Sequence, residues 1–198
     1  MRGDLTVACV LRSGGDFDAE YVERLRDSVA RHLELEHRFV ALSDVPVPCE
    51  RIALKTDWPG WWAKLELFRE LRTGRTLYFD LDTLIVGPID AIAATPFEFA
   101  MLRDWARPET FNSSVMAWSG DCSGIAQDFT TEGGAAYCTP QRWGDQGWIA
   151  ERAPPPITAL QDVFLGSFVS RKLGPRYGAD ERVICFHGQP RPRDSGWR

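Results

Sequence analysis

The stretch from Leu77 to Gly87 constrains the fold most, because it sets two carboxylates into an apolar run. Residues 77–87 read LYFDLDTLIVG, so Asp80 and Asp82 interrupt a leucine-rich, aromatic and β-branched segment. Such a run predicts a buried strand, and buried charges need a compensating cation. Residues two apart on a strand share a face, so both carboxylates can bind one hard divalent cation, Mg²⁺ or Mn²⁺ rather than Zn²⁺. Alternatively, one Asp caps the following turn and the other pairs with an arginine.

The N-terminal part predicts a β-α-β unit. The apolar run 5–11 is typical of a central parallel strand, and 37–42 predicts a second strand. Between them, Asp18 is suited to cap a helix. One face of that helix is apolar and comprises Val22, Leu25, Val29 and Leu33. The loop 12–16 lacks the full GxGxxG spacing, so a Rossmann dinucleotide site is disfavoured.

A helix is expected over residues 60–71, with Trp61, Leu65 and Phe68 as its core face. Lys64 falls within that face. An ammonium group in this position either snorkels to solvent along the apolar side chains or points at an anion. The residues alone favour snorkelling.

The second half predicts strands at 97–102, 111–118 and 182–186. Short helices are expected at 88–94, from Ser119-Gly120-Asp121 to about Phe129, and from Gly144 to about Ala150, with a loop over 131–136. The last strand delivers His187, and the chain after Pro192 is expected to be mobile.

Composition excludes several classes of protein. A length of 198 residues favours one domain, and a net charge of −5 argues against a nucleic-acid partner. Five cysteines without a CxxC pair argue against a disulfide framework and a zinc site. The seven-residue apolar run near the start is too short for a signal peptide or a membrane span, so we expect a cytoplasmic protein.

Five separated motifs, in this order, resemble the GT-A fold glycosyltransferases, in particular the retaining family eight that contains glycogenin and bacterial galactosyltransferases. The motifs are a helical Lys64, the Asp-x-Asp of Asp80-Leu81-Asp82, Asn112 in a strand, Asp145-Gln146, and His187-Gly188 followed by Arg191-Pro192. Two positions depart from the family pattern: Ser114 replaces a usual Gly, and Arg191 a usual Lys. The chain is also small for the family.

The resemblance implies an α/β fold: a single GT-A-like domain over 1–198 with a nucleotide-binding β-α-β start and a mixed, mainly parallel central sheet flanked by helices. The nucleotide-binding half would span about 1–90 and the acceptor and sugar half about 91–192, with 193–198 as the mobile tail. The implied activity is metal-dependent transfer of a sugar, with retention, from a nucleoside-diphosphate sugar to an unknown acceptor. A UDP-sugar is the expected donor.

The resemblance also implies roles for single residues. Mn²⁺ or Mg²⁺ would be held by Asp80, Asp82 and His187. Catalytic roles fall to Lys64, Asp145 and Gln146. Binding of the nucleotide sugar would involve Lys64, Asn112, Asp145, Gln146, Gly188, Arg191 and Leu11. The residues themselves leave alternatives open: His187 equally suits packing at a strand end, and Asp145 and Gln146 suit a helix cap.

Two other functions remain open at this stage. One is a non-catalytic module that binds a nucleotide sugar or a glycan, since the eight tryptophans, among them Trp58, Trp61, Trp62, Trp143 and Trp148, suit stacking on sugar rings. The other is a haloacid-dehalogenase-like phosphatase, which also places an Asp-x-Asp after a strand. Its motif carries Thr two residues after the second Asp, whereas Thr83 follows Asp82 directly.

Overall fold

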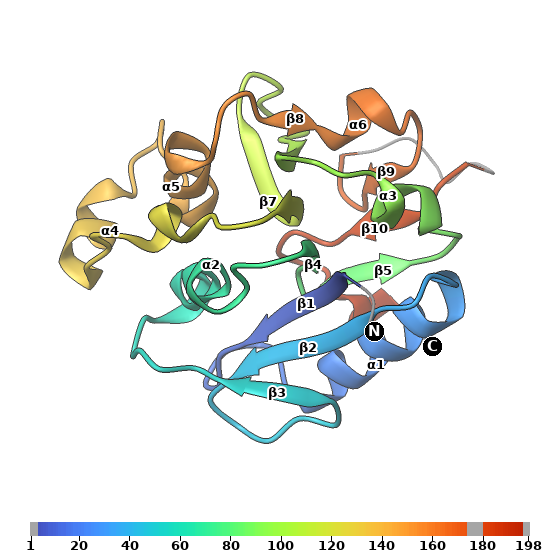
Figure 1. Cartoon of the computed structure of the whole chain (residues 1–198). Coiled ribbons are helices and arrows are strands. Elements are labelled where there is room, and N and C mark those ends of the chain that lie inside the picture. The colour runs from blue at the N-terminus through green and yellow to red at the C-terminus, as the bar shows by residue number, and fades with distance from the viewer. Residues whose placement is uncertain (1–3, 174–179, 196–198) are drawn as a thin grey trace.

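A seven-stranded sheet runs through the centre of the molecule (Figure 1), in the strand order β3-β2-β1-β4-β7-β6-β8. The computed structural model describes residues 4–173 and 180–195. The sheet strands are β1 (Leu5–Leu11), β2 (Arg38–Ser43), β3 (Glu50–Ala53), β4 (Arg75–Phe79), β6 (Phe99–Arg103), β7 (Phe111–Ser119) and β8 (Thr158–Ala159). All neighbouring pairs are parallel except those of β7 with β4 and β6. The expected mixed, mainly parallel sheet is therefore confirmed.

A second sheet of three strands lies beside the first, in the order β5-β10-β9. It consists of β5 (Thr83–Ile85), β9 (Phe168–Ser170) and β10 (Val183–Cys185). The strand before His187, β10, therefore lies in this second sheet and not in the sheet that contains β4. The backbone of the two segments still meets, because Phe186 N–H donates to the Asp82 carbonyl at 3.0 Å.

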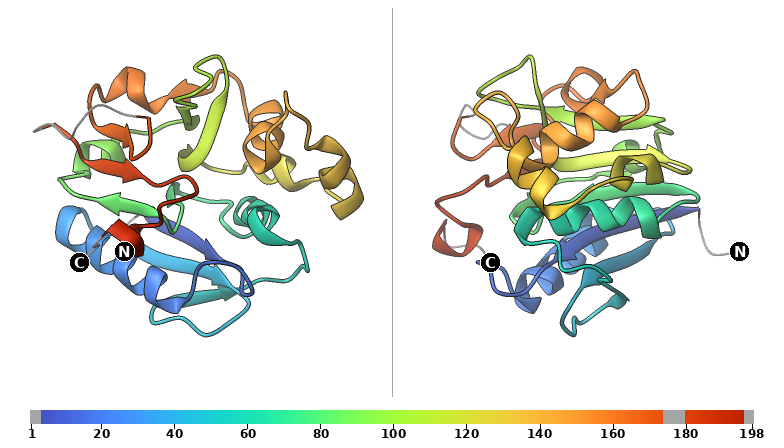
Figure 2. Two further views of the ribbon diagram at one scale, coloured as in Figure 1. Left: turned by 180° about the vertical axis from the view of Figure 1, so that it is seen from behind. Right: turned by 90° about the vertical axis from the view of Figure 1, so that its left-hand side faces the viewer.

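Helices cover both faces of the main sheet (Figure 2). The α-helices are α1 (Ala19–His32), α2 (Glu66–Glu70), α3 (Asp90–Ala94), α4 (Thr131–Tyr137), α5 (Gly144–Arg152) and α6 (Leu160–Val163), and the 3₁₀ helices are η1 (Gly60–Leu65), η2 (Ser123–Ala126) and η3 (Pro192–Ser195). One apolar core lies between the sheet, α1 and α3, and a second lies between the sheet, α2, α4 and α5. Two buried layers explain why strands such as β1 are apolar on both faces.

The β-α-β start forms as expected. Asp18 caps α1 by accepting a hydrogen bond from the Glu20 N–H at 3.1 Å. The apolar stripe of α1 is buried against the sheet, with Val22, Leu25 and Val29 at most 1% exposed. Local capping and helical periodicity thus determine this unit.

The expected helix over 60–71 is instead split into η1 and α2. A 3₁₀ turn repeats every three residues, so Trp62 and Leu65 share a buried face. Trp61 is 60% exposed, which corrects its assignment to the core. Leu65 and Phe68 are fully buried, as expected.

Two further assignments were wrong. Residues 131–136, expected as a loop, belong to α4, which Thr130 caps by accepting a hydrogen bond from the Gly133 N–H. The helix expected to reach Phe129 is only the short η2, which ends at Ala126. The first error arises because the Thr130 cap outweighs the glycine-rich composition of α4, whereas η2 has no side-chain cap.

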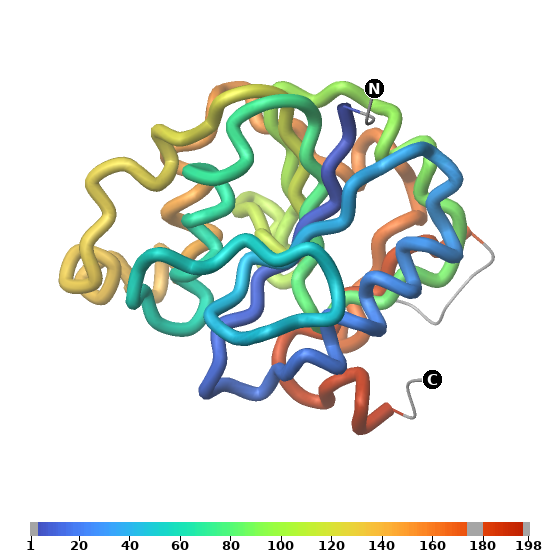
Figure 3. The backbone as a smooth tube through the Cα atoms, turned by 60° about the horizontal axis from the view of Figure 1, so that its bottom comes forward, coloured from blue at the N-terminus to red at the C-terminus, as the bar shows by residue number. Residues whose placement is uncertain are grey.

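The chain near Pro192, expected to begin a mobile tail, forms η3 next to the loop between β1 and α1 (Figure 3). Arg193 contacts Asp18 at 3.0 Å, and Arg191 contacts Asp16 at 2.8 Å. Residues 196–198 lie outside the described part of the chain. Among the helices of residues 4–173 and 180–195, none has the length and apolar character needed to cross a bilayer.

Glu66 provides a test of this fold. It is 1% exposed, and its carboxylate accepts from the backbone N–H groups of Lys55 and Thr56 and from the Thr56 hydroxyl, at 2.6–3.0 Å. Glu66→Ala leaves these three partly buried donors without their acceptor, so we expect a loss of about 2–3 kcal/mol of unfolding free energy in urea titrations. Glu70→Ala removes only the Lys55 ion pair and is the control, with an expected loss below about 1 kcal/mol. Equal losses in the two variants would contradict the described role of Glu66.

Candidate active site

A buried ion cluster lies where β4 ends and β7 begins. The Lys64 ammonium is 2.9 Å from the Asp80 carboxylate and 2.8 Å from that of Asp145. Ser113 joins it, with its hydroxyl 2.9 Å from Lys64 Nζ and 2.7 Å from Asp145. Lys64 is only 5% exposed, so it does not snorkel to solvent; its ammonium points at anions, and those anions belong to the protein.

The antiparallel direction of β7 creates this cluster. Because β7 pairs with β4 in the register Phe79↔Val115, its first residues lie beside the carboxyl end of β4. The Asp80 N–H donates to the Ser114 carbonyl at 2.8 Å, which holds the two segments together. Asp80 is not in a strand: β4 stops at Phe79, and residues 80–83 form a turn in which Thr83 N–H donates to the Asp80 carbonyl. The two carboxylates therefore do not share one strand face, as the sequence had predicted.

The electrostatic balance of the cluster explains its burial. Burial alone would lower the pKa of Lys64, but the Asp145 and Asp80 carboxylates outweigh it and raise the pKa above its usual value. Tyr78 adds a further bond, since its hydroxyl donates to Asp80 at 2.5 Å. Lys64 is therefore a permanent cation that holds both carboxylates in fixed positions.

A chain of side-chain amides extends from this cluster. The Asn112 amide donates to Gln146 Oε1 at 3.3 Å, and Gln146 donates to Asp104 at 3.4 Å. The Asn112 oxygen accepts from the Ser114 N–H at 2.9 Å. Asp145 and Gln146 lie in the first turn of α5, and neither caps it through a side-chain hydrogen bond. The capping alternative is therefore wrong for both residues. Both side chains instead point to the first residues of β7.

Asp82 faces a different cation. Its carboxylate is 2.7 Å from the Arg191 guanidinium, which also contacts Asp16 and lies over the ring of Phe17 at 4.7 Å. Burial, together with the neighbouring Asp80 carboxylate, raises the pKa of Asp82 to about 7, although Arg191 and Lys64 act in the opposite direction.

His187 is oriented by its surroundings. Its Nε2 lies 2.8 Å from the Ser170 hydroxyl, and its ring is stacked on Trp105 with the ring centres 5.3 Å apart. Burial, and then the charge of Lys172, lower the pKa of His187. The ring is therefore neutral at pH 7, which is the form that binds metals.

Asp80 and Asp82 suit a hard cation in their chemistry, since both offer carboxylate oxygens. In the structure each already contacts a cation of the protein, Lys64 or Arg191, and His187 Nε2 contacts Ser170. No group of three or more His, Cys, Asp or Glu side chains is arranged to hold a metal within residues 4–173 and 180–195. The carboxylate pair thus fits a divalent cation, but a preformed three-residue site with His187 is not observed.

Two further residues that were predicted to bind the nucleotide sugar, Gly188 and Leu11, lie in different surroundings. Gly188 follows His187 with a φ of +89°, and a side chain there would meet Lys172 Nζ at 2.8 Å. Leu11 ends β1, but its side chain is 1% exposed and packs in the core, so it offers a ligand no side-chain contact. The structure brings Asn112 and Gln146 together beside the buried cluster.

Several residues of the site were not predicted. Tyr78 precedes Asp80 by two positions, and an aromatic hydroxyl next to buried acids was the available signal. Ser113 stands between two residues that were singled out, in a strand whose direction the sequence does not reveal. Asp104 and Trp105 directly follow β6, and polar or aromatic residues at strand ends are a general signal for a site.

No protein-family model matches the sequence, and no curated protein does. Solved structures do match. The apo form of the glycosyltransferase GlyE of Streptococcus pneumoniae TIGR4 superposes with a TM-score of 0.70 at 14% identity, covering 94% of this chain and 55% of GlyE. The galactosyltransferase LgtC, in complex with donor and acceptor sugar analogues, gives a TM-score of 0.63 at 11% identity, covering 94% of this chain and 88% of LgtC.

The bifunctional glycosyltransferase WbbM is also similar, with a TM-score of 0.59 at 12% identity over 95% of this chain and 46% of WbbM. This chain therefore spans about half the length of GlyE and less than half of WbbM. At these identities the likeness concerns the fold. The chain thus has the mixed α/β, GT-A-like fold that the sequence motifs had suggested.

Lys64→Met tests whether the buried cluster stabilises the fold. Methionine keeps the packing of the stem but leaves Asp80 and Asp145 without their shared cation, so we expect a loss of about 3–5 kcal/mol of unfolding free energy at pH 7. Lys55→Met removes an exposed ion pair and is the control, with an expected loss below about 1 kcal/mol. Urea titrations measure both, and a Lys64→Met protein as stable as the control would contradict a stabilising role of the cluster.

Asp82→Asn tests the electrostatics of the second carboxylate. The folded pKa of about 7 exceeds the unfolded value of 3.8, so between pH 4 and 7 the unfolded state loses a proton that the folded state keeps. Wild-type stability therefore falls over this window, and Asn removes that loss. Each pKa unit is worth about 1.4 kcal/mol, and the lost Arg191 contact offsets part of the gain. In metal-free buffer we expect Asp82→Asn to be about 2 kcal/mol more stable than wild type above pH 7.

The same difference should vanish below about pH 3, where Asp82 is protonated in both states. Asp16→Asn, which alters an exposed partner of Arg191, serves as the control and should follow the wild type within about 0.5 kcal/mol at every pH. A constant difference between Asp82→Asn and wild type from pH 4 to 8 would contradict the raised pKa.

Proposed function

We propose that this chain is a metal-dependent glycosyltransferase that moves a sugar from a nucleoside-diphosphate sugar, with a UDP-sugar as the expected donor, to an acceptor with retention of configuration. The observation that carries the proposal is the buried Lys64, Asp80 and Asp145 cluster at the carboxyl end of β4, within a fold shared with GlyE and LgtC. Ligands of open α/β sheets bind at such an edge.

The nucleotide is assigned to the half built from β1 to β4. The ends of β1 and β2 meet there, and Asp44 accepts hydrogen bonds from the N–H and the hydroxyl of Ser13 at 2.9 and 2.7 Å. These contacts fix the loop that follows β1 beside the site. Arg191 reaches over the same loop through Asp16, so the diphosphate would lie between this loop and the segment after β10.

Asp80 and Asp82 would hold Mn²⁺ or Mg²⁺, with His187 as the third ligand that the family resemblance implies. Bound there, the cation would neutralise the charge that develops on the departing diphosphate. Arg191 would release Asp82 and donate to the phosphate oxygens, for which a guanidinium is well suited.

The polar residues beyond the cluster would handle the sugar. Asp145 places a carboxylate where positive charge develops as the bond to the anomeric carbon breaks, and Asn112 and Gln146 offer amides to sugar hydroxyls. Lys64 acts in this scheme by holding Asp145 and Asp80 in position. The similar structures are glycosyltransferases, which favours this function over the phosphatase alternative.

Calorimetry and thermal-shift assays against UDP-, GDP-, ADP- and CDP-sugars, with and without Mn²⁺, test the donor. A ligand at a hundredfold its Kd stabilises the fold by about 2.7 kcal/mol, which is readily measured. Asp80→Asn should abolish metal-dependent binding. Asp121→Asn, which alters an exposed acid beyond the other end of β7, should leave it unchanged. Failure of every sugar nucleotide to bind would refute the donor assignment.

Release of free sugar from the bound donor tests catalysis. We expect slow, Mn²⁺-dependent hydrolysis by the wild type, and for Asp145→Asn unchanged donor binding with a release rate at least about a hundredfold lower, the scale for losing one group that stabilises transition-state charge. Binding without hydrolysis or transfer by the wild type would instead identify a non-catalytic nucleotide-sugar module.

A further inference from the structure

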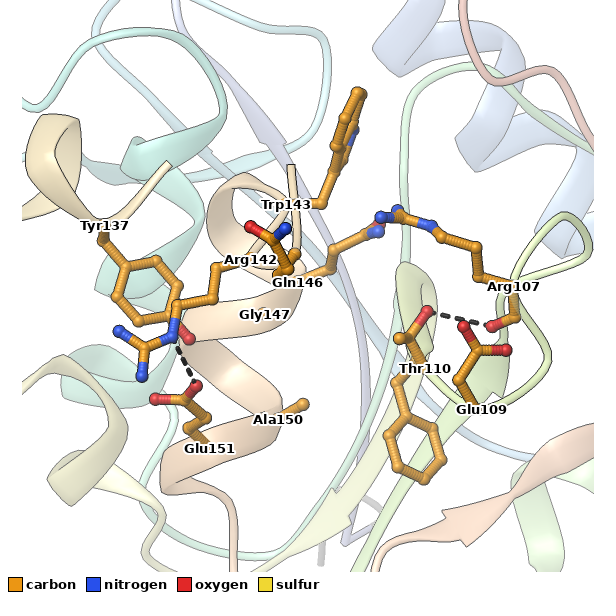
Figure 4. Close-up of a pocket in the computed structure, with 12 residues that line it drawn as sticks. Arg107, Glu109, Thr110, Tyr137, Arg142, Trp143, Gln146, Gly147, Ala150 and Glu151 are labelled. Atoms are coloured by element: carbon orange, nitrogen blue, oxygen red, sulfur yellow. Dashed lines mark hydrogen bonds and ion pairs between the residues drawn. The ribbon is translucent and has the colours of Figure 1, made fainter. Parts of the chain in front are cut away.

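A pocket of about 240 Å³ opens between α5 and the first residues of β7 (Figure 4). On one side lie Gln146, Gly147, Ala150 and Glu151 of α5, and on the other Glu109 and Thr110. The pocket is also lined by Arg107, Phe111, Tyr137, Gln141, Arg142 and Trp143. Pockets for drug-sized ligands have volumes of roughly 300–1,000 Å³, so this one suits a single small ring.

The charges around the pocket balance. Its ionisable lining consists of Arg107, Arg142, Glu109 and Glu151, two of each sign. Arg142 pairs with Glu151 at 3.2 Å, and Arg107 approaches Asp104 at 3.8 Å. A lining with two charges of each sign gives no strong net attraction for an anion or a cation. It favours a neutral ligand with many hydrogen-bonding groups.

Trp143 gives the pocket an aromatic rim. It is 60% exposed, whereas Trp58, Trp62 and Trp148, also considered for sugar stacking, are at most 8% exposed and pack in the core. The Arg107 guanidinium lies 4.9 Å from the centre of the Trp143 ring. This contact orients the ring and leaves its other face for a ligand. Exposed aromatic rings of this kind stack on the C–H face of sugar rings.

The pocket is continuous with the candidate active site through Gln146. This side chain lines the pocket. It also accepts a hydrogen bond from the Asn112 amide and donates one to the Asp104 carboxylate. The neighbouring Asp145 belongs to the buried cluster. A ligand in the pocket is therefore separated from the cluster by one side-chain layer.

We propose that this pocket binds one uncharged sugar ring of an acceptor glycan, stacked on Trp143 and hydrogen-bonded by Gln146, Thr110 and Glu109. The inference rests on the proposed glycosyltransferase function and adds the acceptor class, a neutral carbohydrate. Gln146 then borders both the pocket and the donor side of the candidate site.

Direct binding tests the pocket without donor or metal. On an array of neutral, acidic and basic oligosaccharides, the chain of residues 1–198 should bind neutral glycans in preference. Trp143→Ala should weaken that binding about tenfold or more, and Ala150→Phe, which fills the pocket from α5, should do the same. Leu165→Ala, which removes an 80% exposed apolar side chain from the turn before β9, is the matched control and should bind like the wild type.

Binding of no neutral glycan, a preference for charged glycans, or equal binding by wild type, Trp143→Ala and Ala150→Phe would overturn the proposal. Circular dichroism of each variant separates lost binding from lost folding, and Ala150→Phe gives a second reading if Trp143→Ala does not fold.

Kinetics with the donor then separate this proposal from the proposed function. For a neutral glycan found on the array, Trp143→Ala should raise the acceptor KM about tenfold while the donor KM and the rate of donor hydrolysis stay unchanged. A rise in the donor KM alone would assign Trp143 to the donor and overturn the acceptor assignment. If no sugar nucleotide binds at all but the array result holds, the pocket stands and the transferase function fails.

Discussion

This site depends on the contact of the Lys64 ammonium with two carboxylates, because Asp80 and Asp145 share this cation. Lys64 comes from η1, Asp80 from the turn that follows β4, and Asp145 from α5. Ser113 of β7 completes the contact. Removing these charges from water is expensive, and only their close mutual contact compensates for it. The four segments must therefore assemble together, which explains how residues far apart in the sequence are held within hydrogen-bonding distance. Tyr78 and Asn112 then extend the network on either side.

The sequence predicted well what local patterns determine. The β-α-β start follows from apolar runs, a capping Asp18 and a helical stripe, and the structure confirms it. The clustering of Asp80, Asn112, Asp145 and Lys64 was predicted through the resemblance. Composition alone would not have brought them together, because the contacts span 16 to 81 positions of the chain.

What the sequence could not predict depends on direction and pairing. Nothing in the residues of β7 reveals that it runs antiparallel to β4, although this reversal brings Ser113 to the site. Trp61 was assigned to the core because it lies four residues before Leu65, as on one face of an α-helix, but the chain there forms a 3₁₀ helix and Trp61 is exposed. The partner of Asp82 was likewise unpredictable, since Arg191 reaches it from 109 positions away.

The connection between β6 and β7 serves both sides of the candidate site. Residues 104–110 begin with Asp104, which bonds Gln146, and continue through Arg107 to Thr110 at the pocket. A change in the length of this one hairpin would therefore reshape the pocket while leaving β1 to β4 untouched. Insertions and substitutions in this short loop are thus a route by which the pocket could change its shape without any change to the other half of the sheet.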